Sequence, residues 1–359
     1  MRTVAIEDLK PGMTLGYTIY SSDGRVLLRA GVVLNDNYIN YLIRMKIPVV
    51  GVFDDSDYEK QPILKDVVNR KTRLAAVAQV KNVLLESQES GRLVIEPESL
   101  YGTVGELTDQ LLSNRELIFN LVDLRSQDDY TFAHSVNVCV LSLMTGITMG
   151  YQKRALSILG VGALLHDLGK VKIPDSILNK PGPLTEAEFE IIKTHTVHGA
   201  DMIRKAGNLD EIHALMALQH HENYDGSGYP FGLSRDRIEE YSQIVAIADR
   251  FDAITADRVY RKPYPPVEAF AMCEASANYF VKESVTRAFI YNIAAYPANT
   301  VVELNNGMVG VALVTPKGSS LYPKVKVYFD EKHSILSEPF ELPLHETEGV
   351  YVVRVLESL

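Results

Sequence analysis

Cysteine is scarce in this chain of 359 residues, which contains only two, Cys139 and Cys273, and no tryptophan. Both cysteines lie in apolar runs of helical spacing, so they do not form the disulfide framework of a small secreted protein. Structural zinc sites usually use cysteine ligands, and two thiols are too few for most of them. We therefore expect both thiols to be buried in a protein of the reducing cytoplasm.

Long apolar runs and an excess of positive charge are absent as well. The apolar stretch 136–149 is interrupted by polar residues and is too short to cross a bilayer. The N-terminus turns acidic at Glu7 and Asp8, which does not fit a signal peptide. The formal net charge of −10 disfavours broad binding to nucleic acid or to an anionic membrane. We expect a cytoplasmic protein with no membrane span and no nucleic-acid partner.

The spacing of apolar residues predicts a mainly α protein with smaller β-containing parts at both ends. We expect four parts: a small α/β module in 1–62, a helical connector in 63–125, a large helical domain in 126–299, and a β-rich appendage in 300–359. In the connector, helical spacing covers 63–85 and returns up to Leu124, with a weakly structured stretch at 91–105. Its helices could form a homodimer interface or pack on the large domain, and the sequence leaves this open.

Two local patterns are more specific. Residues 15–20 and 25–28 have strand character and flank a polar turn, which predicts a hairpin in the N-terminal module. Thr185 followed by Glu188 forms a capping box, which marks the start of a helix. Counting from that start, His195 faces the protein core.

Histidines and aspartates gather between residues 128 and 257 in an order that indicates a site for two metal ions. Imidazole and carboxylate suit borderline divalent metals. Two adjacent pairs end apolar helical runs, and neighbouring helical residues diverge by about 100°, so each pair can reach two ions or one carboxylate can bridge them. The candidate ligands are His134, His166, Asp167, His195, His220, His221 and Asp249.

A hydrogen-bonded core residue is the alternative for each of these histidines, and for any one alone we would prefer it. All seven groups together, in apolar helices without other evident partners, favour metal. Two divalent ions about 3.5–4 Å apart can share a hydroxide and stabilise charge on a phosphoryl transition state. The site would then be positive enough to hold a phosphodiester even in an acidic protein.

The ordered motifs around these residues resemble the HD-GYP family of the HD superfamily. The resemblance covers about half of the chain, and the N-terminal module is more loosely similar to one often found ahead of HD-GYP domains. The matching motifs are 166–170 (HDLGK), 173–174, 177–180, Leu184 and Thr185 with Glu188 and His195, 220–230 (HHENYDGSGYP), and 249–255 (DRFDAIT) continuing to 258–261.

This resemblance implies a helical HD-type domain that hydrolyses the bacterial second messenger cyclic di-GMP to linear pGpG, with further conversion to GMP left open. By family likeness one ion would bind His134, His166, Asp167 and Asp249, and Asp167 would bridge to a second ion bound by His195, His220 and His221. Asp167 is therefore expected to be catalytic, with the shared hydroxide as the nucleophile. Iron or manganese is the preferred metal, although ligand type does not separate them from nickel, cobalt or zinc.

Substrate contacts follow from the same resemblance. Lys170 resembles the family lysine at the scissile phosphate, and its alternative is a surface lysine. Arg258 and Arg261 resemble residues that hold the second phosphate or a guanine, and their alternative is a solvated pair on a helix. Gly228 and Tyr229 are candidate substrate-binding residues in a loop that could equally be structural or dock a GGDEF-domain protein.

One departure from the family concerns the number of ions. Some members use a glutamate four residues before the first histidine for a third ion, whereas this chain has Tyr130 there and Asp129 one step earlier. We therefore expect two ions. Separately, we expect Asp225 and Asp252 to orient histidine or arginine side chains. Two other functions stay open: a phosphohydrolase acting on other nucleotides, and a cyclic di-GMP receptor with little turnover.

Overall fold

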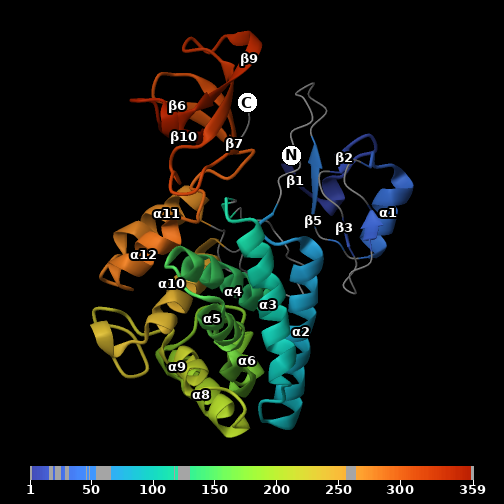
Figure 1. The fold of residues 1–359 in the computed structure, drawn as a ribbon. Coiled ribbons are helices and arrows are strands. Elements are labelled where there is room, and N and C mark those ends of the chain that lie inside the picture. The colour runs from blue at the N-terminus through green and yellow to red at the C-terminus, as the bar shows by residue number, and fades with distance from the viewer. Residues whose placement is uncertain are drawn as a thin grey trace.

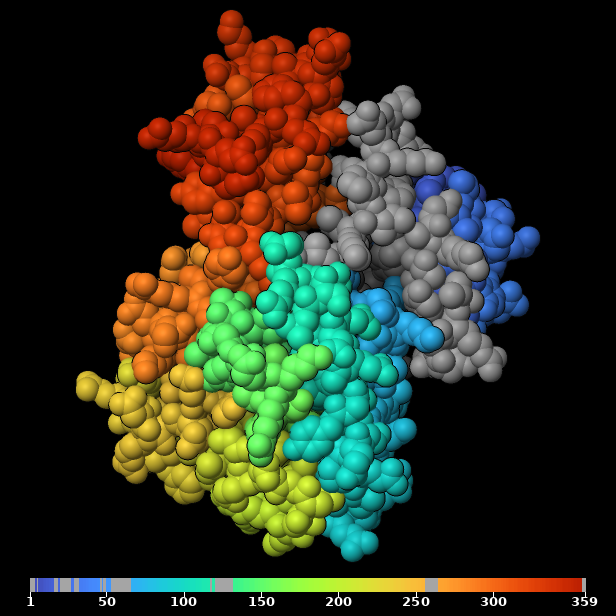
Figure 2. Space-filling model, viewed as in Figure 1, coloured from blue at the N-terminus to red at the C-terminus, as the bar shows by residue number. Residues whose placement is uncertain are grey.

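Separate hydrophobic cores organise the chain into an N-terminal module, a helical body and a C-terminal sheet (Figure 1). A computed structural model describes residues 2–15, 19–20, 26–28, 32–45, 47, 49–53, 66–116, 118–119, 130–255 and 264–356. The helical body has the largest of these cores. Figure 2 shows the C-terminal sheet at one end of this body and the α8–α9 region at the other. The expected mainly α fold with β-containing ends is confirmed.

The N-terminal module packs one helix against two small antiparallel sheets, with strand orders β1-β5-β2 and β3-β4. Ile39 and Leu42 are the buried residues of the helix, and Asn35 caps its start by accepting from the backbone N–H of Tyr38. The predicted hairpin is present as the β3–β4 pair, while the predicted turn lies outside the described residues. The elements are β1 (Arg2–Ala5), η1 (Ile6–Asp8), β2 (Thr14–Leu15), β3 (Ile19–Tyr20), β4 (Val26–Leu28), α1 (Asp36–Arg44) and β5 (Val49–Phe53).

Two helices, α2 (Arg70–Ser90) and α3 (Pro97–Ser113), form the connector and lie side by side against the helical body (Figure 1). The prediction of a weakly structured stretch at 91–105 is wrong, because α3 starts at Pro97. Proline is well tolerated in the first turn of a helix. The two glycines of α3 cost only about 1 kcal/mol each, and the buried stripe that includes Leu100 and Val104 offsets this cost.

The helical body is built on α4 and α5, which pack on each other and on α2, α3, α9, α10 and α12. Both are apolar on most of their surface, so they are buried, and the thiols of Cys139 and Cys273 are buried in the same core as expected. No described helix has the length and apolar character of a membrane span. The elements are α4 (Tyr130–Thr148), α5 (Lys153–Leu165), η2 (Leu168–Lys172), α6 (Asp175–Leu178), α7 (Glu186–Lys193), α8 (His195–Ala206), α9 (Glu211–Gln219), η3 (Arg235–Arg237), α10 (Glu240–Thr255), α11 (Pro266–Ala275) and α12 (Glu283–Ile290).

The C-terminal part is an antiparallel sheet with strand order β10-β6-β7-β8-β9, as its alternating sequence predicts. Its inner face packs Val302, Val325 and Val327 together with Phe270 of α11 and Tyr296. The sheet therefore shares its core with the end of the helical body and lies beside α11 in Figure 1. The elements are β6 (Val301–Leu304), β7 (Val309–Val314), β8 (Lys324–Phe329), β9 (Ile335–Pro343), η4 (Leu344–Glu346) and β10 (Val352–Leu356).

Candidate metal centre

The ends of buried helices deliver the predicted ligands to one place. α5 is buried along its last turns, so the residues that follow it, His166 and Asp167, lie inside the protein. The next turn, η2, then packs on the start of α8, where His195 begins the helix. Gly169 permits this contact, because a Cβ there would lie 1.9 Å from the backbone oxygen of His195. The sequence therefore brings His166, Asp167 and His195 together through backbone packing.

The seven predicted ligands converge, and they make up all the candidate metal groups found among the described residues. Within each group the ligand atoms lie within 4.8 Å of one another. The groups overlap, so they form one centre. They are His134, His166 and Asp167; His195, His220 and His221; and His166, His220 and Asp249.

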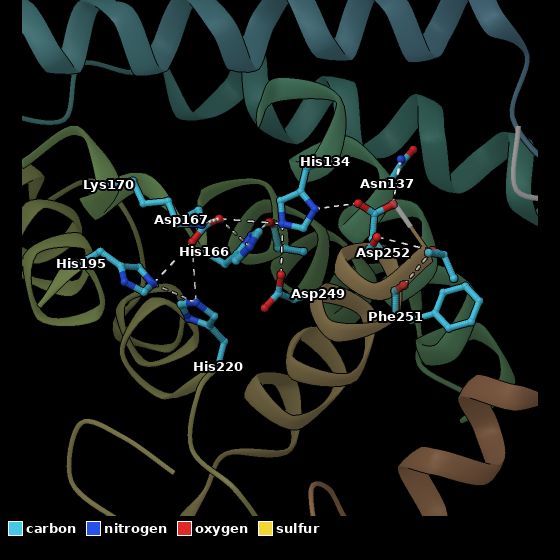
Figure 3. A network of polar contacts seen from close by, with 12 residues as sticks. His134, Asn137, His166, Asp167, Lys170, His195, His220, Asp249, Phe251 and Asp252 are labelled. Carbon is cyan, nitrogen blue, oxygen red and sulfur yellow. Dashed lines mark hydrogen bonds and ion pairs between the residues drawn. The ribbon is translucent and has the colours of Figure 1, made fainter. Parts of the chain in front are cut away.

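Asp167 lies between two sets of imidazoles, with one carboxylate oxygen toward each (Figure 3). Its Oδ2 is 3.4 Å from Nε2 of His166 and 3.8 Å from Nε2 of His134. Its Oδ1 is 3.5 Å from Nε2 of His195 and 3.8 Å from Nε2 of His220. This is the arrangement in which one carboxylate can bridge two cations.

In four of the five candidate histidines, Nδ1 makes a hydrogen bond away from the centre, and Nε2 faces the centre. The Nδ1 atoms of His166, His195 and His220 each lie 2.7–2.9 Å from a backbone carbonyl three residues earlier. A carbonyl oxygen can only accept, so Nδ1 carries the proton and Nε2 keeps a lone pair. His134 has a carboxylate in this role, since its Nδ1 is 2.7 Å from Oδ2 of Asp252. Such outer partners are typical of metal-bound histidines.

Burial and charge set the protonation states of the centre. Burial lowers the pKa values of His195 and His220, and lowers that of His221 to about 3, so these rings are neutral near pH 7. Burial would raise the pKa of Asp167, but Lys170 and His166 hold it well below its ordinary value. Burial likewise opposes ionisation of Asp249, and His134 outweighs it and keeps the pKa low.

The residues present fit metal ions. Nε2 of His166 and Oδ1 of Asp167 are buried and have no hydrogen-bond partner among the described residues. A buried polar atom without a partner costs about 1–3 kcal/mol. Both atoms face the centre, together with the neutral imidazoles of His195, His220 and His221 and the ionised carboxylate of Asp249, and imidazole and carboxylate are the groups that divalent cations bind.

The predicted substrate residues lie at different distances from this centre. Lys170 contacts it directly, with Nζ 2.5 Å from Oδ2 of Asp167. Tyr229 stacks on the ring of His221 at 4.7 Å between centroids. Gly228 lies against the backbone, where a Cβ would be 2.3 Å from the nitrogen of Asn223, so its position has a packing reason. Arg258, Arg261, Asp129 and the side chain of Tyr130 lie outside the described residues.

The two expected orienting aspartates differ. Asp252 does contact a ligand, His134. The prediction for Asp225 is wrong, because its Oδ1 accepts from the backbone N–H and the hydroxyl of Ser227. An aspartate that bonds two residues onward closes a local turn, which is a common role of this side chain.

Two residues near the centre have roles that the sequence patterns did not predict. Glu222 is buried and accepts from the backbone N–H groups of Phe231 and Leu233, so it holds the loop that contains Tyr229. Asn137 lies one turn beyond His134 on α4 and donates to Asp252 at 3.0 Å. Its position three residues from a candidate ligand in an apolar helix was a usable signal.

Comparisons with known proteins agree with this geometry. Residues 111–281 match the model of the HD domain. A cyclic di-GMP phosphodiesterase of Pseudomonas aeruginosa is 36% identical over 232 residues, covering 65% of this chain and 56% of the relative. Another from Thermotoga maritima is 34% identical over 239 residues, covering 65% of this chain and 64% of the relative. The chain thus spans less than two thirds of either relative.

A solved structure supports the fold assignment. An HDG"Y"P protein from Bdellovibrio bacteriovorus superposes with a TM-score of 0.50 over 80% of this chain and 97% of that one. At 17% identity this likeness concerns the fold alone. The chain therefore matches the HD domain over residues 111–281, and the solved structure agrees with an HD-type fold.

Proposed function

We propose that this chain hydrolyses cyclic di-GMP at a centre of two divalent metal ions. The observation that carries the proposal is the position of Asp167, whose two carboxylate oxygens face two separate sets of imidazoles. The names of the relatives from Pseudomonas aeruginosa and Thermotoga maritima support the substrate. Two carboxylates against two dications leave excess positive charge, which favours a phosphodiester.

The seven converging residues would hold the ions. His134, His166 and Asp249 would bind one, His195, His220 and His221 the other, and Asp167 both. Iron or manganese is the preferred metal for this ligand set. When bound, the pair supplies a water of lowered pKa and neutralises charge on the phosphoryl group under attack.

The remaining groups would bind and orient the substrate. Lys170 is 31% exposed, so its ammonium can turn from Asp167 to a phosphate oxygen once cations neutralise that carboxylate. Tyr229, stacked on His221, would form a wall of the substrate site. Arg258 and Arg261 are proposed to hold the second phosphate or a guanine. The linear dinucleotide pGpG is the proposed product.

The test is hydrolysis by the full chain after anaerobic reconstitution with Mn²⁺ or Fe²⁺. Substrates would be cyclic di-GMP, another cyclic dinucleotide and a mononucleotide, with products separated by chromatography and Asp167→Ala as the inactive control. Preferential conversion of cyclic di-GMP to pGpG is expected. Equal turnover of a mononucleotide would favour a general phosphohydrolase. Tight binding of cyclic di-GMP without turnover, with both ions present, would favour a receptor.

Metal analysis of the same samples tests the stoichiometry. Two equivalents per chain are expected from the seven ligands. Three equivalents would contradict the assignment of a dinuclear centre, and none after anaerobic purification without chelators would contradict the metal site itself.

A further inference from the structure

A line of polar side chains, buried at Arg73, Asp252 and His134 and partly buried at Asp66 and Asn137, runs from the first turns of α2 to the metal centre. The guanidinium of Arg73 donates to both oxygens of Asp66 at 3.1 Å and to Oδ1 of Asn137 at 3.3 Å. Nδ2 of Asn137 donates to Oδ1 of Asp252 at 3.0 Å, and Oδ2 of Asp252 is 2.7 Å from Nδ1 of His134. The line therefore joins the connector to a candidate ligand.

On both α4 and α10, a candidate ligand is followed one helical turn later by a polar residue of this line. His134 and Asn137 are three residues apart on α4, and Asp249 and Asp252 are three residues apart on α10. Figure 3 shows this pairing, with Asp252 between His134 and Asn137. Arg73 comes from α2, which packs on α4.

Arg73 determines which groups donate and which accept along this line. A guanidinium has only donors, so Asn137 must turn its carbonyl oxygen toward Arg73 and its amide NH₂ toward Asp252. The reverse orientation would oppose N–H to N–H and oxygen to carboxylate. Asp252 then accepts at both oxygens, so Nδ1 of His134 is the nitrogen that must donate. Once a cation replaces the proton on Nε2, the lone pair of His134 lies on Nε2, which faces Asp249 and Asp167.

We propose that Arg73, anchored by Asp66, is a positioning residue that fixes the tautomer and ring orientation of His134 through Asn137 and Asp252. The inference rests on the proposed metal centre and concerns how one of its ligands is held. It does not depend on which substrate the centre acts on. It also explains why polar groups occupy this part of the core. Arg73 is 2% exposed and Asp252 is 1% exposed, and burying such groups is costly unless each one is paired.

Affinity for Mn²⁺ tests the role directly, measured for each site by competition with a chelator in the full chain. Arg73→Leu and Asn137→Leu should each weaken one of the two sites by roughly 10–100-fold, the usual effect of losing an outer partner of a metal ligand. Arg73→Lys should recover most of the loss, because an ammonium also only donates. The double variant should lose no more than Asn137→Leu alone, since both act through one chain of contacts.

Gln110→Leu is the matched control for a merely structural effect. The side chain of Gln110 bonds to Asn69 and Thr72, so it also ties the start of α2 to its surroundings, but within the described part of the chain it bonds to neither Asn137 nor Asp252. It should lower the melting temperature of the metal-free protein while leaving both Mn²⁺ affinities within about threefold of the wild type, well inside the loss expected for an outer partner.

The outcomes separate this inference from the proposed function. Unchanged Mn²⁺ affinity in folded Arg73→Leu or Asn137→Leu would overturn the positioning role, as would an equal loss in Gln110→Leu. If Arg73→Leu does not fold, Arg73→Lys and Asn137→Leu decide the matter. Failure of the wild type to hydrolyse cyclic di-GMP would overturn the proposed function and leave the positioning role intact.

Discussion

Nε2 of His134 lies 3.1 Å from Oδ1 of Asp249, and both atoms belong to proposed ligands of the same ion. Burial lowers the pKa of His134, but Asp249 and Asp252 outweigh burial and raise it to about 10 in the metal-free protein. The imidazolium pair therefore stabilises the metal-free fold fully below pH 6.5, and this contribution is lost as pH rises through about 10. A cation has to replace the proton that sits between the two residues.

Metal binding at pH 7 is accordingly expected to release at least one proton per chain from His134. Titration calorimetry with Mn²⁺ in buffers of different ionisation enthalpy measures this number. Binding should also weaken as pH falls, because the proton competes with the ion. His134→Gln removes the titrating ring and should reduce the proton release. Identical observed heats in all buffers would mean that His134 is already neutral.

Lys170 and Lys172 provide a matched pair of lysines on one turn. Nζ of Lys170 contacts Asp167, whereas Nζ of Lys172 donates to the backbone oxygen of Gly91. Lys170→Gln should lower kcat for cyclic di-GMP by about 10²–10³-fold, because a cation that stabilises charge in the transition state is lost. Lys172→Gln should keep near-normal kcat. Both variants should bind two ions. A normal metal content would then show that a lower kcat reflects the lost contact with the phosphate and not a lost ion.

The convergence of the candidate ligands was partly predictable, because His134, His166 and His220 interrupt or end apolar helices. His166 and His220 follow buried runs, and a polar residue in that position needs a partner inside the protein. The position of Asp167 between two sets of histidines was a reasonable hypothesis, because it directly follows His166 at the end of a buried helix. The connector was harder, because Gly102 and Gly105 resemble chain breaks although the buried stripe of α3 is continuous through them.

Only part of the contacts that orient the candidate ligands was predictable from spacing. Arg73 reaches Asn137 across 64 positions in the sequence, and no periodicity specifies such a contact. Asp225 and Asp252 each follow a candidate ligand within four residues, yet one closes its own loop and the other contacts His134. Which occurs depends on how α4 and α10 pack, and this packing is a property of the folded core.

Gly169 tests how the backbone brings η2 and α8 together. A Cβ at this position would also lie 2.4 Å from the nitrogen of Gly199. The backbone atoms of His195 and Gly199 both belong to α8, so relieving the clash would require a shift of this helix or of η2. Gly169→Ala should lower the free energy of unfolding by about 1–3 kcal/mol, as overpacking does. It should also weaken the site that uses His195, measured as Mn²⁺ affinity.

Gly105 serves as the control for Gly169. It lies within α3, and a Cβ there meets nothing within 4 Å. Gly105→Ala should raise the free energy of unfolding by about 0.5–1 kcal/mol, because alanine loses less backbone entropy in a helix. Equal stability changes in the two variants, by urea denaturation of metal-free protein, would contradict the packing argument.

Glu188 should make the helix before His195 sensitive to acid. Lys180 lies 2.6 Å from its Oε2, the backbone N–H of Thr185 donates to the same oxygen at 2.7 Å, and these contacts lower the pKa of Glu188 from 4.5 to about 2. A lowered carboxyl pKa stabilises the fold above pH 4.5, and the contribution is lost as pH falls through about 2. Glu188→Gln keeps a side chain that can accept in the capping box but removes the charge.

The melting temperatures of metal-free wild type and Glu188→Gln should therefore differ at pH 7 and converge toward pH 2, with the wild type more stable at the higher pH. Glu190→Gln is the matched control, because Glu190 is 68% exposed on the same helix and forms an exposed ion pair with Lys193. Its curve should follow the wild type, since exposed pairs contribute little. A Glu188→Gln curve parallel to the wild type from pH 7 to pH 2 would show that the charge of Glu188 does not stabilise α7.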